Sequence, residues 1–443
     1  MNPARRAALR RAVGQTAHHR RPLGIIAAVL LAVACVRVPP GDEGPSYYFG
    51  ALQSRPEKAH LERSKGIQVA EMQISWDRYE VREGEYSSQY LESVKQELDR
   101  FQKAGLLVEV SLGLNRAPSW LYEKYPEASY VNQNSDRLTE TPNMVFSQTV
   151  REKAQGYVDQ LARVIGLDNF WAIRVGVSGS GEFTYPSDGP GLPDTKTYYW
   201  AFDKNAQSGA RTGRPPTVTA NPFPGWKPGQ HTYRGKAFTK AQVGEWYDWY
   251  LRSLSDAVNW QIKYYRSLGY DGFLKVLVPG MGYYPQNYQR TLDGHLHVDE
   301  TDDSRLVGIG AGFYKTLGQI HDRRNVQIVP TSLVDGTGEP RNNGCAPGDR
   351  QVDIQAPPGH VQTSWSSVRW ISRIARQYNF ALLNGESAGT HVSPYYPGVV
   401  AQAARQMKSC GLQGLMWAFE RNLYDGTPGS SLADYSAVIS RYN

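Results

Sequence analysis

Residues 170–187, FWAIRVGVSGSGEFTYPS, decide the fold that we expect for this chain. Residues 170–177 are mostly apolar, which is typical of a buried strand. The small-residue turn 178–181 ends this strand and is followed at once by a single carboxylate, Glu182. Residues 380–386, FALLNGE, repeat the plan with a short apolar run, a glycine and a glutamate. An acid directly after a buried strand is typical of the way a parallel barrel presents a catalytic side chain.

Six more apolar runs of strand length occur along the chain. They cover residues 47–52, 66–76, 106–114, 273–278, 326–330 and 414–419. Segments with helical spacing lie between most of the strands and cover residues 90–105, 147–165, 240–268, 306–321, 367–378 and 397–409. Strands that mostly alternate with helices predict an α/β fold, a (β/α)8 TIM barrel. The loop 183–237 is long for a compact domain, and we expect it to roof the catalytic face.

The N-terminal 35 residues have the features of an export signal. Six arginines without any acid precede the apolar run 23–34, which is too short to span a bilayer as a helix. The sequence LAVAC at the end of this segment resembles the lipobox of bacterial lipoproteins, which implies acylation of Cys35 and a location on the outer surface of the cell membrane. The alternative is an ordinary signal peptide, cut near Ala34, and a secreted protein. Residues 36–46 read as a flexible tether, which leaves residues 47–443 as the catalytic domain.

The charge of the chain gives no sign of a nucleic-acid partner. The whole sequence has a formal net charge of +7. Six of its 49 basic residues and none of its 42 acidic residues precede Cys35, so the remainder has a net charge of only +1. The high isoelectric point therefore reflects mainly the export segment, and we expect no nucleic-acid binding.

Two cysteines follow Cys35, namely Cys345 and Cys410. Cysteines of an exported protein can pair. In the predicted barrel, however, Cys345 follows strand six on the catalytic face and Cys410 precedes strand eight on the opposite face. A disulfide needs Cα atoms within about 7 Å of each other, so we do not expect these two residues to form one.

Cleaving a glycosidic bond requires two carboxyl groups, because one protonates the leaving oxygen while the other attacks the sugar or activates water. Glu182 and Glu386 fit this requirement, and their small neighbours would let a substrate approach closely. Three other acids compete with them. Glu420 follows strand eight, Glu71 lies inside strand two and reads as a barrel carboxylate with its own partners, and Asp188 reads as the cap of a turn.

Glutamates after strands four and seven resemble the arrangement in clan A glycoside hydrolases. That resemblance implies that Glu182 is the general acid/base and that Glu386 is the nucleophile of a retaining reaction. The first half of the chain is similar to family 42 β-galactosidase-type enzymes. The matching positions are Trp76, Glu80, Gly84 and Tyr86 after strand two, the stretches 117–120 and 125–126 after strand three, and Trp417 at strand eight.

One position departs from the clan A pattern. Gly181 stands where these enzymes usually have an asparagine. Residues 181–187, GEFTYPS, instead resemble a stretch of the β-amylases, which are inverting barrel enzymes with glutamates after the same strands. Two alternatives therefore stay open: an inverting, β-amylase-like hydrolase, and a surface glycan-binding lipoprotein without activity. Carboxyl groups about 5.5 Å apart would indicate retention, and about 6.5–9.5 Å would indicate inversion.

Aromatic and polar side chains at strand ends are candidates for binding the carbohydrate, because flat rings stack on sugar faces and polar groups bond to hydroxyls. The candidates are Trp120, Tyr185, Tyr283, Tyr284 and Trp417 for stacking, and Arg55, Asn115 and Asn384 for hydroxyl contacts. His295, His297 and Asp299 alternate along the chain, but no second cluster completes a ligand shell. We therefore expect neither a metal nor a cofactor.

Overall fold

The computed structural model describes residues 47–187, 196–210, 213–297, 301–389 and 395–443. The predicted signal segment with Cys35, the tether 36–46, Asp188 and Asp299 lie outside the described residues. None of the described helices has both the length and the apolar character that crossing a bilayer requires.

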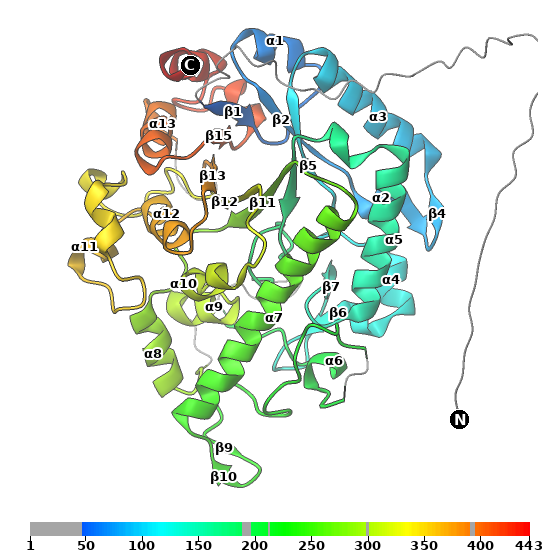
Figure 1. Cartoon of the computed structure of the whole chain (residues 1–443), viewed down its shortest axis with the longest axis vertical. Coiled ribbons are helices and arrows are strands. Elements are labelled where there is room, and N and C mark those ends of the chain that lie inside the picture. The colour runs from blue at the N-terminus through cyan, green and yellow to red at the C-terminus, as the bar shows by residue number, and fades with distance from the viewer. Residues whose placement is uncertain (1–46, 188–195, 211–212, 298–300, 390–394) are drawn as a thin grey trace, which may run out of the picture. The chain divides into compact units, whose positions relative to one another are not determined.

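The central sheet is a closed parallel barrel, as the sequence predicts (Figure 1). Its strands are β1 (Tyr48–Ala51), β2 (Val69–Gln73), β5 (Leu107–Ser111), β8 (Ala172–Val175), β11 (Phe273–Val278), β12 (Val326–Pro330), β13 (Leu382–Leu383), β14 (Gly385–Glu386) and β15 (Gly414–Trp417). The strand order is β13-β12-β11-β8-β5-β2-β1-β15-β14. Strands β13 and β14 are two halves of one strand. Because β13 pairs with β12 and β14 with β15, this split seventh strand closes an eight-stranded barrel.

Helices surround the barrel, and most coincide with the predicted segments (Figure 1). The longer ones are α3 (Ser88–Lys103), α5 (Gln148–Val164), α7 (Lys240–Ser267), α12 (Ser367–Gln377), α13 (Val399–Cys410) and α14 (Leu432–Tyr442). The predicted helix 306–321 is wrong as a single element. It is divided into α9 (Asp302–Gly308), α10 (Phe313–Thr316) and a short 3-10 turn, because glycines interrupt it and Gly310 has a positive φ of 72°.

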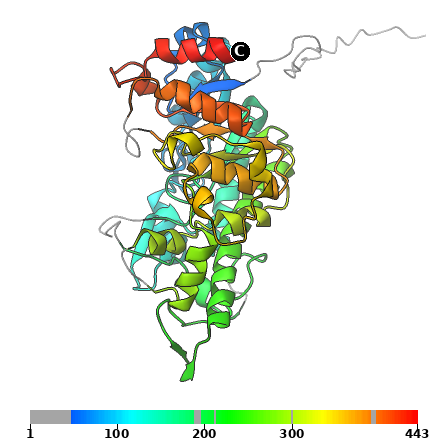
Figure 2. The same cartoon turned by 90° about the vertical axis from the view of Figure 1, so that its left-hand side faces the viewer.

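The shorter elements lie in the connections. They are α1 (Ala59–Ser64), α2 (Trp76–Tyr79), α4 (Ser119–Lys124), α6 (Lys204–Gln207), α8 (Pro285–Asp293) and α11 (His360–Thr363), and the hairpins β3 (Glu80–Arg82) with β4 (Glu85–Tyr86), β6 (Ser129–Val131) with β7 (Arg137–Pro142), and β9 (Thr232–Tyr233) with β10 (Lys236–Ala237). In both views the β9–β10 hairpin lies at the opposite end of the barrel domain from α14 (Figures 1 and 2).

The described residues of the long loop 183–237 pack beside the N-terminal half of α7, where the Tyr185 ring stacks on Tyr250 with centroids 4.1 Å apart and Trp226 meets Trp246 edge-on at 5.3 Å. That the loop roofs the catalytic face stays a prediction, because its residues 188–195 and 211–212 lie outside the described residues. The many aromatic side chains of the loop are buried in this packing. Their role in the structure is thus a second hydrophobic layer around α7.

The barrel interior has its own small hydrophobic cluster, separate from the main core between sheet and helices. Its buried members are Leu52, Val69, Met416 and Ala418, with Tyr48, Leu107, Trp171 and Phe419 packed against them. Side chains two residues apart on a strand point to the same side. Glu71 therefore follows Val69 into the barrel, and Glu109 follows Leu107, which places charged groups directly above apolar ones.

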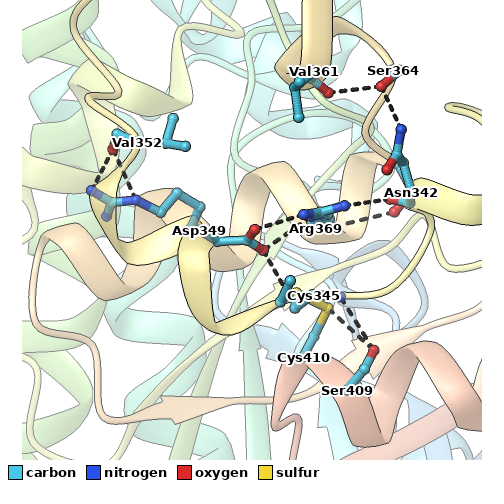
Figure 3. A network of polar contacts seen from close by, with 12 residues as sticks. Asn342, Cys345, Asp349, Val352, Val361, Ser364, Arg369, Ser409 and Cys410 are labelled. Carbon is cyan, nitrogen blue, oxygen red and sulfur yellow. Dashed lines mark hydrogen bonds and ion pairs between the residues drawn. A yellow bond between two sulfur atoms is a disulfide. The ribbon is translucent and has the colours of Figure 1, made fainter.

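Cys345 and Cys410 form a disulfide, with Cα atoms 4.8 Å apart, so the expectation that they stay unpaired is wrong (Figure 3). We predicted no disulfide because we expected the loop after β12, which contains Cys345, to stay on the catalytic face. The loop instead runs along the outside of α12, where Asp349 forms an ion pair with Arg369 at 2.7 Å. It reaches the C-terminal end of α13, where the Cys345 amide donates to the Ser409 hydroxyl.

Candidate active site

One cavity of about 420 Å³ lies at the C-terminal ends of the barrel strands and contains both predicted glutamates, Glu182 and Glu386. Its volume is within the ~300–1,000 Å³ range of ligand pockets. The walls come from residues within or after β1, β2, β5, β8, β11, β12, β14 and β15, together with Gln261 and Tyr265 of α7, so nearly the whole ring of strands contributes. Two residues 204 positions apart in the sequence thus face the same space, as the two-carboxylate hypothesis requires.

Glu182 lies on a tight turn that follows β8. The amides of Val177 and Ser178 both donate to the carbonyl oxygen of Glu182, at 2.8 and 3.1 Å, and close this turn. The Glu182 carboxylate is half-buried and accepts hydrogen bonds from the Ser180 hydroxyl and the Thr331 hydroxyl, each at 2.7 Å. Each oxygen has one donor, which fixes the carboxylate at the cavity edge while leaving it accessible.

Glu386 has a very different environment, because it is buried in strand β14. Its Oε2 accepts a hydrogen bond from Arg174 Nη2 at 3.2 Å, and its Oε1 lies 3.0 Å from Arg174 Nη1. Burial raises the pKa of Glu386 to about 7 from an ordinary value of 4.5, although the nearby Arg174 charge opposes this shift.

Arg174 belongs to a buried group of charges in the barrel interior. Its Nη1 also lies 3.1 Å from Glu109 Oε1, and the other oxygen of Glu109 pairs with Lys275. Glu71 lies beside Glu109 in the sheet register and accepts a hydrogen bond from the Gln53 amide at 2.8 Å. Glu71 is thus a barrel carboxylate with its own partner, as predicted, and it lines the cavity.

Of the eight residues proposed for sugar binding, Asn115 is the one that lines the cavity. Its Nδ2 donates to the Gly179 carbonyl at 2.5 Å and so supports the turn below Glu182. Asn384 is buried behind the cavity, and its Oδ1 accepts from the Gly385 amide. Arg55 lies outside the cavity lining, because its guanidinium pairs with Glu420 at 2.6 Å.

The four aromatic candidates in the predicted site are buried in the packing and do not line the cavity. Trp120 donates to the Glu80 carbonyl at 3.0 Å, and Trp417 donates to the Ser430 hydroxyl at 2.8 Å. Tyr185 stacks on Tyr250, and the hydroxyl of Tyr283 bonds to that of Tyr247. These contacts show that the four rings belong to the hydrophobic core. The fifth ring, Tyr284, bonds to the Gln362 carbonyl.

Glu420 and His295 have structural partners. Glu420 is fully buried in its ion pair with Arg55. The ring of His295 contacts the Phe238 carbonyl through Nε2 and lies 4.1 Å from the His231 ring. Among the described residues there is no group of three histidine, cysteine or acidic side chains that could hold a metal ion.

The motif after strand two builds a small hairpin. Trp76 Nε1 donates to one oxygen of Glu80 at 2.7 Å, and the Gly84 amide donates to the other at 2.8 Å. Both oxygens are thus used to hold the β3–β4 turn, in which Gly84 has a positive φ of 78°. The motif residues stabilise this connection beside the barrel rather than lining the cavity.

Parts of the sequence are similar to known proteins. Residues 50–167 match the family model of the family 42 β-galactosidases. The β-galactosidase BgaA of Clostridium cellulovorans is 31% identical over 80 residues, which are 18% of this chain and 12% of that protein. The chain therefore spans a small part of the length of this curated relative.

Solved structures share the fold over most of the chain. The catalytic domain of β-amylase from Paenibacillus polymyxa is 14% identical, with 90% of this chain and 99% of that one covered and a TM-score of 0.59. The β-galactosidase of Marinomonas ef1 is 13% identical, with 89% of this chain and 59% of that one covered and a TM-score of 0.54. The family 42 β-galactosidase Gan42B of G. stearothermophilus is 13% identical, with 90% of this chain and 57% of that one covered and a TM-score of 0.51. These structures confirm the predicted barrel fold, and the family model confirms the resemblance to family 42 β-galactosidases over residues 50–167, which supports the predicted class of glycosidase.

Proposed function

We propose that the protein is a glycoside hydrolase that cleaves O-glycosidic bonds of an oligo- or polysaccharide by a retaining, β-galactosidase-like reaction. The observation that carries this proposal is the shared cavity of Glu182 and Glu386 at the C-terminal ends of strands four and seven. Active sites of barrel enzymes lie at this end. The partial match to the family 42 β-galactosidases supports the same class.

The two environments suit different roles. Glu386 attacks the anomeric carbon through one carboxylate oxygen, and a covalent bond to the sugar forms while the glycosidic C–O bond breaks. Glu182 gives its proton to the leaving oxygen. Glu182 then takes a proton from water, which attacks the anomeric carbon and releases Glu386. The accessible position of Glu182 suits proton exchange, and Arg174 stabilises the charged form of Glu386.

An inverting reaction is the second candidate, and two observations favour it. Gly181 replaces the asparagine of clan A, and the catalytic domain of a β-amylase shares the fold over nearly its full length. In this case Glu182 remains the acid and Glu386 activates a water molecule. Proton NMR of the anomer that is first released separates the two reactions, because retention gives the substrate's anomer and inversion gives the other.

The proposal is tested with residues 47–443, purified and assayed on a panel of aryl glycosides and polysaccharides. Glu386→Gln removes the nucleophile at nearly constant volume and is expected to abolish turnover while the far-UV circular dichroism is unchanged. Glu85→Gln, on the exposed hairpin strand β4, is the matched control and should keep wild-type activity. An active Glu386→Gln enzyme would remove this residue from the mechanism.

We also propose that the protein is exported and anchored through an acyl group on Cys35. The basic segment, the short apolar run and the sequence before Cys35 support this location. The disulfide Cys345–Cys410 adds support, because disulfides persist in oxidising compartments. Metabolic labelling with a palmitate analogue tests the anchor: the full chain should be labelled and Cys35→Ala should not. Equal labelling of both chains would contradict it.

A further inference from the structure

Four neighbouring strands each carry one charged residue at an inward-facing position of the barrel. These residues are Glu71 on β2, Glu109 on β5, Arg174 on β8 and Lys275 on β11. Glu109 and Lys275 are completely buried, and the Arg174 side chain is 14% exposed. Bulky branched residues dominate this layer in most barrels. The ionic layer therefore departs from the usual composition of a barrel interior.

The contacts run as a chain from the floor of the barrel to the cavity. Lys275 forms an ion pair with one oxygen of Glu109, and Arg174 Nη1 lies 3.1 Å from the other oxygen. The Arg174 guanidinium also contacts Glu386: the same Nη1 lies 3.0 Å from Oε1, and Nη2 lies 3.2 Å from Oε2. Because Glu109 holds Arg174 from below, the planar guanidinium has one orientation in which to meet Glu386.

We propose that Arg174 is a positioning residue for Glu386 and that Glu109 and Lys275 form the anchor that holds Arg174 in place. The inference rests on the function proposed above and concerns how that site is held ready. Replacing buried ion pairs by apolar side chains is often neutral or stabilising, so fold stability alone gives little reason for this layer. The layer can instead serve catalysis, because a nucleophilic carboxylate must be held in one orientation to attack the sugar.

The two oxygens of Glu386 both lie close to Arg174, but in different geometries. Oε2 accepts the hydrogen bond from Arg174, whereas Oε1 has no hydrogen-bond donor among the described residues, although Arg174 Nη1 lies 3.0 Å away. Glu386 lines the cavity. Both carboxylate oxygens thus lie within 3.2 Å of the Arg174 guanidinium, which fixes the plane of the carboxylate relative to the cavity.

The charges around Glu386 make the inference testable through opposite effects. Burial raises the pKa of Glu386, the charges of Arg174 and Lys275 lower it, and the charge of Glu109 raises it. Glu71, on β2, acts on the same guanidinium, because its negative charge raises the pKa of Arg174. Removing a cation should therefore raise the titration midpoint of Glu386, and removing the Glu109 charge should lower it.

The first experiment follows Glu386 directly, without substrate. The protein is labelled with [5-13C]glutamate, and the carboxyl signal of Glu386 is assigned by its loss in Glu386→Gln. Arg174→Met and Lys275→Met should each raise the midpoint by about one pH unit or more, and Glu109→Gln should lower it. A midpoint that stays constant, or three shifts of the same sign, would overturn the inference.

The second experiment separates charge from geometry. Arg174→Lys keeps the positive charge but loses the planar fork, so we expect a midpoint near that of wild type and a kcat lower by about tenfold or more. If Arg174→Met does not fold, Arg174→Lys and Glu109→Gln, which nearly retain side-chain volume, carry the test. Arg174→Lys with wild-type kcat would overturn the positioning role.

A matched control removes a buried ion pair elsewhere. Arg151 on α5 pairs with Asp256 at 2.9 Å, away from the cavity. Arg151→Met should lower stability and leave the Glu386 midpoint in place; a shifted midpoint would contradict a local effect of Arg174. Failure of the proposed function is distinct, because it would appear as full activity of Glu386→Gln, whatever the midpoints are.

Discussion

The carbonyl of Gly181 lies directly against Gly176, so that a β-carbon at Gly176 would be 1.8 Å from the carbonyl oxygen. The end of strand four and the turn that carries Glu182 can fold onto each other only because Gly176 has no side chain. The position of Glu182 therefore depends on a residue six positions earlier in the chain.

Gly176→Ala should displace the turn and with it the Glu182 carboxylate. We expect kcat/KM to fall by about a hundredfold, because a displacement of roughly 1 Å can have that effect. Steady-state kinetics on the best aryl glycoside measures the change. Gly156→Ala, on α5 with no neighbour within 4 Å of its new methyl group, is the control and should retain activity. Full activity of Gly176→Ala would show that the turn adapts without cost.

The disulfide should stabilise the domain against unfolding. It joins residues 65 positions apart, which corresponds to roughly 4 kcal/mol of loop-closure entropy. Cys345→Ser with Cys410→Ser should therefore lower the midpoint of urea unfolding, and a reducing agent should lower that of wild type but not of the double variant. An equal midpoint for wild type with and without reductant would contradict this role.

The stability should also depend on pH through a buried carboxyl pair at the outer side of the barrel. The Tyr424 hydroxyl donates to Glu62 Oε1 at 3.0 Å, while Arg55 donates to Glu420 Oε2 at 2.6 Å. Burial, together with the charge of Glu420, raises the pKa of Glu62 to about 8 from 4.5.

A pKa raised by folding means that the native state binds the proton more tightly than the unfolded chain does. The contribution to stability is complete below about pH 4.5 and is lost as the pH rises through 8. The free energy of unfolding of wild type should therefore fall between pH 5 and pH 9, and Glu62→Gln should weaken this dependence. Denaturant titrations at several pH values measure it, and parallel curves for the two proteins would refute the assignment.

The barrel could be predicted from the sequence because its strands are short apolar runs with clear ends. Strands β11 and β12 have the predicted bounds, Glu182 follows strand four as expected, and Glu386 is the last residue of the split seventh strand. The ionic layer also leaves a signal, since Glu71, Glu109, Arg174 and Lys275 each interrupt an apolar strand. That pattern indicates inward-facing charges, but it does not show which of them pair.

The burial of the aromatic rings and the course of the long loops could not be predicted, because both depend on contacts between residues that are distant in the sequence. Trp417 lies at a strand end, yet it packs under the Tyr395 ring, because sequence spacing does not show on which side of a strand a ring is buried. The Cys345 loop leaves the catalytic face through contacts with α12 that are distant in sequence. Strand-end position alone thus predicts acids better than it predicts aromatic binding residues.

The central claim is that Glu182 and Glu386 act as one unit on one bond, and a double-variant comparison tests it most directly. Glu182→Gln and Glu386→Gln should each reduce kcat by on the order of 10³-fold. The double variant should then be no slower than the slower single variant, because residues that act together are not additive. Wild-type turnover in either single variant, or losses that multiply in the double variant, would contradict the account.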